Sequence, residues 1–387
     1  MNILFPYMAR WHAVNWTRYH SLLWALADDG HVVHVLQTPP RDSRETNFQE
    51  IARREHPNIH LHDVALHSGL WNRQVPLDKL VKKAYFSLAA LSSARRLIET
   101  EHIDVLLLYN IPQYRFLALD VPVTVFDYAD DYVEMLGHEL GRLNNPLARA
   151  LARSMLYRMM ARATIVTAVS HVLAHEVRGA VYVIPNGVSL AKASARPSSE
   201  IHEIRNGGKP VVGYVGAFEY FIDLDMIFNV AQAMPEMHFL LVGSGRDWAG
   251  FAERVRRAGL GNVQLTGGVP HDHVFEYIRQ MDVCLNLFRP IPVSHRACPI
   301  KLFEYLSQTK PVVSTRLDEI AHIDDGFLYF GDSTEEVCDQ VRHILAHPEE
   351  AAHRAQHGYK VTVDRYTWEA IARQLVAAIA ARKPQIA

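Results

Sequence analysis

The sequence predicts an α/β protein with two Rossmann-like domains, each built on a doubly wound parallel sheet. Its 387 residues are more than one ordinary hydrophobic core accommodates, which favours two domains. Short apolar runs alternate with helical stretches along both halves of the chain, a pattern typical of parallel sheets. A segment rich in Ser, Ala, Gly and charged residues separates the two series and indicates a linker.

The expected strands fall into two series. The first series comprises residues 2–6, 31–36, 105–109, 124–127, 164–169 and 181–184. The second comprises residues 211–215, 239–242, 263–265, 283–287, 312–314 and 327–330. A helix at 20–27 follows the first strand, and the chain is helical from Ile344 onward, with breaks at Pro348 and Tyr366. These patterns predict four parts: an N-terminal domain at residues 1–188, a linker at 189–209, a second domain at 210–364 and a C-terminal segment at 365–387.

The composition narrows the class of protein. Apolar residues make up 49% of the chain and charged residues 21%, as in soluble globular proteins. A formal net charge of −2 gives no overall attraction to nucleic acid, so no nucleic-acid partner is expected. The three cysteines form no C-x-x-C pair, which favours a reducing cytoplasm. The first ten residues indicate a strand and not a signal peptide, and no run reaches the roughly 18 apolar residues that span a membrane.

The segment PIKLFEYLSQTKPVVST, at residues 299–315, carries the strongest chemical signal. It predicts a helix, a tight turn and a buried strand. The expected buried side of the helix carries Leu302, Phe303 and Leu306. Residues three and four apart share the expected polar side: Lys301, Glu304, Tyr305 and Gln308. A lysine and the helix dipole can hold a diphosphate, and a carboxylate one turn later can accept both hydroxyls of a ribose. The segment therefore predicts a nucleotide-binding helix.

This segment resembles the donor-site helix of the GT-B glycosyltransferases of the group-1, or family-4, type. The family pattern is a Glu, seven residues, a second Glu and a helix ending in G-x-P-V-V-x-[ST]; Glu304 matches the second Glu and residues 310–315 match the tail. The form P-x-K-L-x-E-Y-L resembles a subgroup of teichuronic-acid and capsule-type transferases. Arg296 stands at the place of the first Glu. Thr309 replaces the usual glycine, at a cost of roughly 1 kcal/mol if that position adopts a positive φ.

The resemblance implies two Rossmann-like domains with a ligand cleft between them and a helix at 368–381 that crosses back to the N-terminal domain. It also implies a donor-binding set in the second domain: Gly216, Gly243, Arg296, Lys301 and Glu304. The family's turn after the first strand of this domain carries an Arg and a Lys, but residues 216–223 here carry neither. Lys301 is therefore the expected diphosphate ligand. The structural alternative for that turn is a tight connection in which Asp223 caps the next helix.

No metal and no cofactor are expected. Asp223 and Asp225 form a D-x-D pattern like the metal motif of GT-A transferases, but a helix start favours aspartate for capping. His60 and His62 share one strand face without a third ligand at metal-site spacing. No G-x-G-x-x-G opens a helix, so a nicotinamide dehydrogenase is a weak alternative.

Two loops of the first domain are candidates for the acceptor side. The loop after the first strand supplies Arg10, His12 and Asn15, where His12 is a possible proton acceptor. Asp127, Asp130 and Asp131 close the strand at 124–127 and can orient hydroxyls of the acceptor or of the transferred sugar. Capping of the following helix is the structural alternative for this cluster. The expected catalytic residues are Lys301, Asp130, Asp131 and His12, and the expected acceptor-binding residues are Arg10, Asn15, Asp127 and Asp130.

Two expected helices, at 80–96 and 147–162, are basic. They favour either contact with an anionic membrane, as in family members that act on lipid-linked acceptors, or ordinary packing with a solvated arginine side. The turn Pro185-Asn186-Gly187-Val188 resembles a family turn, and we interpret it as structural.

Together these features predict a retaining glycosyltransferase in the cytoplasm or at the inner face of the membrane. Its co-substrate is a nucleotide-diphosphate sugar, and its acceptor is a glycan, a lipid-linked molecule or a small molecule, in the synthesis of cell-surface polysaccharide or glycoconjugate. Two alternatives remain open: a sugar-nucleotide epimerase of the same fold, and a non-catalytic protein that binds nucleotide sugars.

Overall fold

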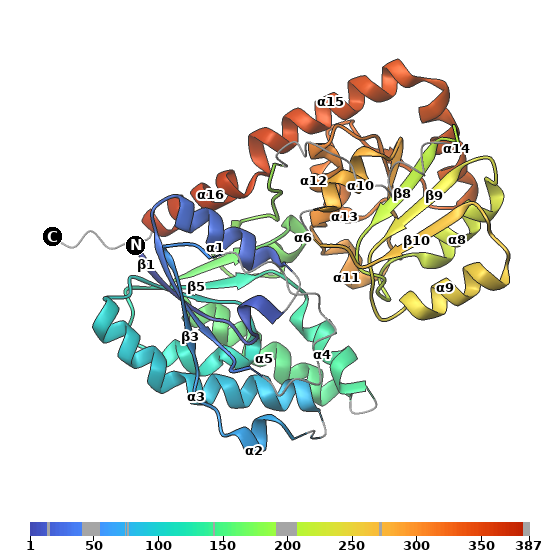
Figure 1. Ribbon diagram of the computed structural model, residues 1–387. Coiled ribbons are helices and arrows are strands. Elements are labelled where there is room, and N and C mark those ends of the chain that lie inside the picture. The colour runs from blue at the N-terminus through green and yellow to red at the C-terminus, as the bar shows by residue number, and fades with distance from the viewer. Residues whose placement is uncertain are drawn as a thin grey trace. The chain divides into compact units, whose positions relative to one another are not determined.

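The computed structural model describes residues 1–13, 16–40, 55–73, 75, 77–141, 144–190, 207–270 and 273–381. They form two compact units: Met1–Pro185 with the segment from Trp368 onward, and Asn186–Thr367 (Figure 1). Each unit contains one parallel sheet flanked by helices, so the expected α/β class with two Rossmann-like sheets is confirmed. The structure describes only the two ends of the expected linker, because residues 191–206 lie outside the described ranges.

The first sheet has seven parallel strands in the order β3-β2-β1-β4-β5-β6-β7. The strands are β1 (Asn2–Pro6), β2 (Val32–Gln37), β3 (Ile59–Asp63), β4 (Val105–Leu108), β5 (Val123–Tyr128), β6 (Ile165–Ala168) and β7 (Tyr182–Val183). The central strands β4, β5 and β6 are buried along their whole length, as strands covered on both faces must be. The sheet order reverses between β1 and β4, which makes this the switch point of the first unit.

Helices on both faces complete the first unit. They are η1 (Trp11–Ala13), α1 (Arg18–Asp28), α2 (Ser68–Trp71), α3 (Asp78–Glu101), η2 (Ile111–Ala118), α4 (Tyr132–Leu140), α5 (Pro146–Arg162), α6 (His171–Ala174) and α16 (Trp368–Ala380). The last helix, α16, packs on α1, while η2 contacts both α3 and α5 on the other face of the sheet (Figure 1). Within the described ranges, no helix combines the length and the apolar character needed to cross a membrane.

The second sheet has six parallel strands in the order β10-β9-β8-β11-β12-β13. They are β8 (Val211–Val215), β9 (His238–Val242), β10 (Val263–Gly267), β11 (Val283–Asn286), β12 (Val312–Ser314) and β13 (Tyr329–Phe330). The helices of this unit are α8 (Leu224–Ala233), α9 (Trp248–Arg257), α10 (Val274–Arg279), α11 (Pro292–His295), α12 (Ile300–Ser307), α13 (Asp318–Ile323), α14 (Thr334–Ala346) and α15 (Pro348–Arg365). Here the strand order reverses between β8 and β11, so ligands of this fold class would approach their carboxyl ends.

The turn after α12 shows the conformational cost of Thr309, which replaces the glycine of the family pattern. Thr309 has a φ of 55°, in the left-handed region, and is thus one of the described non-glycine residues with positive φ. Its N–H donates to the Leu306 carbonyl, and the Lys310 N–H donates to the Tyr305 carbonyl, which closes the helix. A β-branched side chain is disfavoured in this conformation, whereas glycine adopts it freely.

We predict that Thr309→Gly raises the free energy of unfolding by about 1 kcal/mol, because it removes the steric cost at this position. Chemical denaturation of the full chain measures the change. The control is Gln308→Gly one residue earlier, where φ is −100° and glycine relieves no strain; it costs backbone entropy and the side-chain hydrogen bonds to Arg279 and Ser307, so this variant should be destabilised. A destabilised Thr309→Gly variant would contradict this account of the turn.

Candidate functional site

The candidate site of the second unit centres on the first turns of α12. Glu304 is buried, with 2% of its side chain exposed, and its Oε2 lies 2.8 Å from the Nζ of Lys301. Lys301 keeps 30% of its side chain exposed. A buried carboxylate is stable only when it is paired or hydrogen-bonded, and Lys301 supplies such a pair. The two predicted residues are thus brought together at the start of one helix.

Tyr305 does not lie where helical spacing predicts. We expected it on a polar side, but it is fully buried. Its hydroxyl accepts from the Val215 N–H at 2.8 Å and donates to the Val215 carbonyl at 3.2 Å. Burial raises the pKa of this hydroxyl well above its usual range. The contact joins α12 to the last residue of β8, so Lys301 and Glu304 are held relative to the carboxyl end of the sheet. The expectation was wrong because spacing shows which residues share a side, but not whether that side is exposed.

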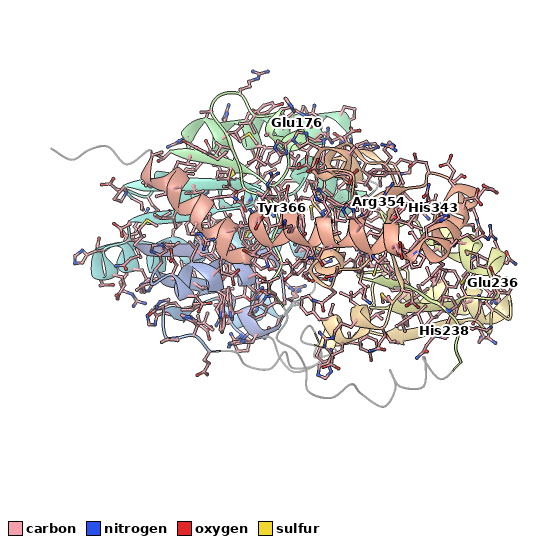
Figure 2. All side chains as sticks on the ribbon, turned by 90° about the horizontal axis from the view of Figure 1, so that it is seen from above. Glu176, Glu236, His238, His343, Arg354 and Tyr366 are labelled. Carbon is pink, nitrogen blue, oxygen red and sulfur yellow. The ribbon has the colours of Figure 1, made fainter. Side chains whose placement is uncertain are left out.

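Further contacts fix α12 from its other sides. The ring of Phe303 stacks on that of Tyr366 with centroids 4.3 Å apart; Tyr366, labelled in Figure 2, directly follows α15. The Nδ2 of Asn186 donates to the Cys298 carbonyl at 2.6 Å, just before the helix. The Pro185–Val188 turn therefore has a structural contact at the entrance to α12. Such support keeps the first turn of the helix in one orientation.

Gly216 and Gly243 lie at the carboxyl ends of β8 and β9. A Cβ on Gly243 would lie 1.8 Å from the Gly216 carbonyl oxygen, and the φ of Gly243 is 137°. Only glycine fits there, because the two loop backbones touch. The close approach is the structural reason for Gly243, whereas a Cβ on Gly216 would lie 2.4 Å from the Tyr214 hydroxyl.

The loop after β8 is a tight connection. Asp223 caps α8 by accepting from the Met226 N–H at 2.9 Å, as the structural alternative predicted. Asp225 forms ion pairs with Arg254 and Arg289. Both acidic groups of the D-x-D pattern are thus occupied by protein partners. Over the ranges that the structure covers, no cluster of three or more His, Cys, Asp or Glu side chains is suited to hold a metal ion.

Two arginines of the second unit, Arg246 and Arg296, have surroundings that differ from those of Lys301. Arg246 pairs with Glu219 at 2.9 Å across the loops that follow β9 and β8. Arg296, at the place of the family's first Glu, ends α11 and is half-buried. Positive charge near α12 therefore comes from Lys301 itself and, four residues before the helix begins, from Arg296.

In the first unit, Asp127 belongs to a buried ion pair. Its carboxylate accepts from Arg18 Nε at 3.0 Å and Nη2 at 3.2 Å, and from the Thr167 hydroxyl at 2.7 Å. Arg18 also donates to the carbonyls of Ile184 and Pro185. Both carboxylate oxygens are occupied, so we correct the expected role of Asp127 from acceptor contact to the positioning of Arg18. Sequence reasoning missed Arg18, because an arginine in the first turn of a helix ordinarily lies in solvent.

The two following aspartates have different environments. Asp131 is buried and caps α4 by accepting from the Glu134 N–H at 3.1 Å, so the structural alternative holds for this residue. Asp130 keeps an exposed surface, yet the protein around it raises the pKa of its carboxyl to about 7. Desolvation is the largest cause, the carboxylates of Asp127 and Asp131 add to it, and Arg18 opposes it. Asp130 is therefore the member of the cluster that can exchange a proton near neutral pH.

The loop after β1 contributes less than expected. Arg10 pairs with Asp63 at 3.1 Å and donates to the Thr38 carbonyl, so its charge is largely neutralised by the protein. His12 is half-buried in η1, and Asn15 lies outside the described residues. Nearby, burial lowers the pKa of His20 to about 4, so this ring is neutral at physiological pH.

Two family models match separate parts of the chain. The model described as "Glycosyltransferase Family 4" matches residues 17–192, which include Arg18 and the aspartate cluster. The model described as "Glycosyl transferase-like" matches residues 225–377, which include α12 with Lys301 and Glu304. The matches thus fall on both units and on the candidate residues of each.

Curated relatives and solved structures agree with the family models. The chain is 29% identical over 201 residues to the protein named as the teichuronic acid biosynthesis glycosyltransferase TuaH of Bacillus subtilis (strain 168), covering 49% of this chain and 50% of the relative. It is 25% identical over 225 residues to 2-deoxystreptamine glucosyltransferase of Streptomyces kanamyceticus, covering 54% of this chain and 57% of the relative. The matches thus span about half the length of these relatives.

Solved structures extend the likeness of fold to nearly the whole chain. Sucrose-phosphate synthase of Thermosynechococcus elongatus superposes with a TM-score of 0.75 at 16% identity, covering 98% of both chains. HepE of Anabaena, solved with UDP-glucose, gives a TM-score of 0.68 at 16% identity over 98% of this chain and 100% of that one. With both sheets, both family models and the α12 motif in agreement, residues 17–192 and 225–377 match glycosyltransferases of the group-1, or family-4, type, and both units have the sheets of the GT-B fold.

Proposed function

We propose that this protein is a retaining glycosyltransferase that moves a sugar from a nucleotide-diphosphate sugar to a glycan, lipid-linked or small-molecule acceptor. The observation that carries the proposal is the buried Glu304, paired with Lys301 in the first turns of α12, beside the carboxyl end of β8. The relationship to TuaH supports a place in the synthesis of cell-surface polysaccharide or glycoconjugate.

The donor nucleotide would bind at α12. Lys301 and the N-terminal end of the helix dipole favour a diphosphate, and the partly exposed Lys301 can approach a ligand without leaving Glu304. The Glu304 carboxylate would accept the ribose hydroxyls. Solved structures of the same fold contain UDP-glucose in HepE and UDP-2-fluoro glucose in the Escherichia coli trehalose-6-phosphate protein, which supports a nucleotide sugar as the ligand class.

The first unit would bind the acceptor. Asp130 is partly exposed and its carboxyl has a pKa near 7, so it can take the proton that an acceptor hydroxyl loses during transfer. His12 is a second candidate for proton transfer. Lys301 and the helix amides would stabilise the departing diphosphate, which removes the need for a metal ion in this role.

The basic helices α3 and α5 would bring the protein to the inner face of the membrane. Both helices lie on the same side of the first sheet, and both carry exposed arginines. An anionic membrane attracts such a surface. This placement would suit a lipid-linked acceptor.

The first test addresses Glu304. We expect Glu304→Gln to weaken binding of the matching nucleoside diphosphate by about ten- to a hundredfold, because hydrogen bonds to a charged group contribute roughly 1.5–3 kcal/mol. Isothermal calorimetry with UDP, GDP and dTDP identifies the nucleotide in the parent and measures the loss in the variant. Glu276→Gln is the matched control, since that carboxylate is also mostly buried, with 14% exposed, in the same unit. Unchanged affinity in Glu304→Gln would refute the assignment.

The second test addresses Lys301. Negative charge grows on the diphosphate as the glycosidic bond breaks, so Lys301→Met should lower kcat more than it raises KM. Turnover of the donor sugar that matches the nucleotide, with and without a glycan acceptor, provides both constants. Because Lys301 neutralises a buried carboxylate, the double variant Lys301→Met/Glu304→Gln should recover thermal stability without recovering turnover. A Lys301→Met variant with unchanged kcat would exclude the proposed role.

The third test addresses the ionisation of Asp130. The pKa of Asp130 in the folded protein, near 7, lies above its usual value of 3.8, so the folded state holds this proton more tightly than the unfolded state. The stability that the group contributes is therefore fully present below about pH 4 and is lost as the pH rises through 7. We expect the melting temperature of Asp130→Asn, relative to the parent, to increase between pH 5 and pH 8. Calorimetric scans across this range measure it, with Asp120→Asn, an exposed residue of the same unit, as the control. A difference that stays constant with pH would mean that Asp130 ionises normally.

A further inference from the structure

An apolar groove of about 700 Å³ lies on the first unit between α3, η2 and α5. Its walls are mainly hydrocarbon: Ala84, Leu88 and Leu91 from α3, Pro112 and Ala118 from η2, and Met155 from α5. Leu88 is 48% exposed although it is a large apolar residue. The volume lies within the range of ligand pockets, and a soluble protein rarely leaves such a surface uncovered without a use for it.

Three arginines also line this groove, one from each element: Arg95 of α3, Arg115 of η2 and Arg162 of α5. All three side chains are exposed, and none forms an ion pair with another residue in the part of the chain that the structure describes. Their charges are therefore available to a ligand.

The two helices place Arg95 and Arg162 at one end of the groove. Each precedes a strand of the same parallel sheet, β4 and β6, so α3 and α5 run in the same direction. In both helices the lining is apolar first and basic later: Leu88 and Leu91 precede Arg95, and Met155 precedes Arg162. The groove is thus apolar along its length and cationic at the end where both helices finish.

We propose that this groove binds one anionic membrane phospholipid, with a hydrocarbon chain along Leu88 and Met155 and the phosphate at Arg95 and Arg162. This site deepens the membrane contact proposed above and rests on that contact, but not on the donor chemistry. The groove would thus provide a defined binding site for a single lipid in addition to a general electrostatic attraction.

The charge pattern favours a lipid over the other possible occupants. A second copy packed on this face by two-fold symmetry would bring the same unpaired arginines together, and like charges repel. A peptide would bury backbone polar groups, but only Ser87 and Tyr114 offer uncharged side-chain hydrogen bonds in the lining. A hydrocarbon chain needs no hydrogen bonds, and one phosphate can accept from several arginines.

Co-sedimentation with phosphatidylcholine vesicles, with and without phosphatidylglycerol, tests the site. We expect the parent to bind only the vesicles that contain phosphatidylglycerol, and Arg95→Gln/Arg162→Gln to lose about fivefold in affinity for each arginine removed. The matched control is Arg96→Gln/Arg153→Gln, which removes one exposed arginine from each helix outside the groove. Leu88→Gln should also weaken binding, whereas Val81→Gln, a 42% exposed position of the same helix outside the groove, should not.

If both double arginine variants lose the same affinity for the vesicles, the groove is not the lipid site and only a diffuse electrostatic contact remains. Absence of binding by the parent would overturn the membrane contact as well. Self-association that light scattering detects in the parent and that Leu88→Gln abolishes would assign the face to a second copy. Calorimetric binding of the nucleoside diphosphate, measured on the same variants, should be unchanged, so failure of the groove remains distinguishable from failure of the proposed transferase.

Discussion

The hydrogen bonds between the Tyr305 hydroxyl and the backbone of Val215 are the contact on which the second unit's site depends. Val215 is the last residue of β8, and both its N–H and its carbonyl bond the hydroxyl in the interior, where losing a partner is costly. The same contact sets the position of α12, because Tyr305 directly follows Glu304. A buried polar link between a helix and a strand end thus determines where the preceding Lys301–Glu304 pair can meet a ligand.

In the first unit, an ion pair and not a tyrosine hydroxyl connects the elements at the carboxyl ends of the strands. Arg18 joins the end of β5, through Asp127, to the carbonyls that follow β7. A buried arginine needs all its partners, so it fixes three segments together. Asp130 lies three residues after Asp127, and desolvation, opposed by Arg18 and reinforced by the neighbouring carboxylates, raises the pKa of its carboxyl. Each unit therefore contains one rigid polar contact and, beside it, a charged group that reaches the surface.

Much of the fold could be predicted from the sequence, because apolar strand runs and helix breaks are local signals. The second series of strands agrees with the structure within two residues at each end, and α15 and α16 meet at the predicted break. The pairings that organise the sites could not be predicted in this way. Arg18 and Asp127 are far apart in the chain, and only the folded sheet brings them together. The same holds for Tyr305 and Val215, whose contact depends on how α12 packs on β8.

The departures from the family pattern share one effect: they change where positive charge lies in the second unit. The turn after β8 lacks the usual Arg and Lys and contains Glu219, which Arg246 neutralises. The connection between α11 and α12 has an arginine at position 296, where the family has a glutamate, and Lys301 follows in the helix. Compared with the family pattern, positive charge thus lies less in the loop after β8 and more in a segment held by Tyr305, Phe303 and Asn186. A diphosphate bound there would contact a helix that these side chains hold in place, and this favours a fixed position for the leaving group.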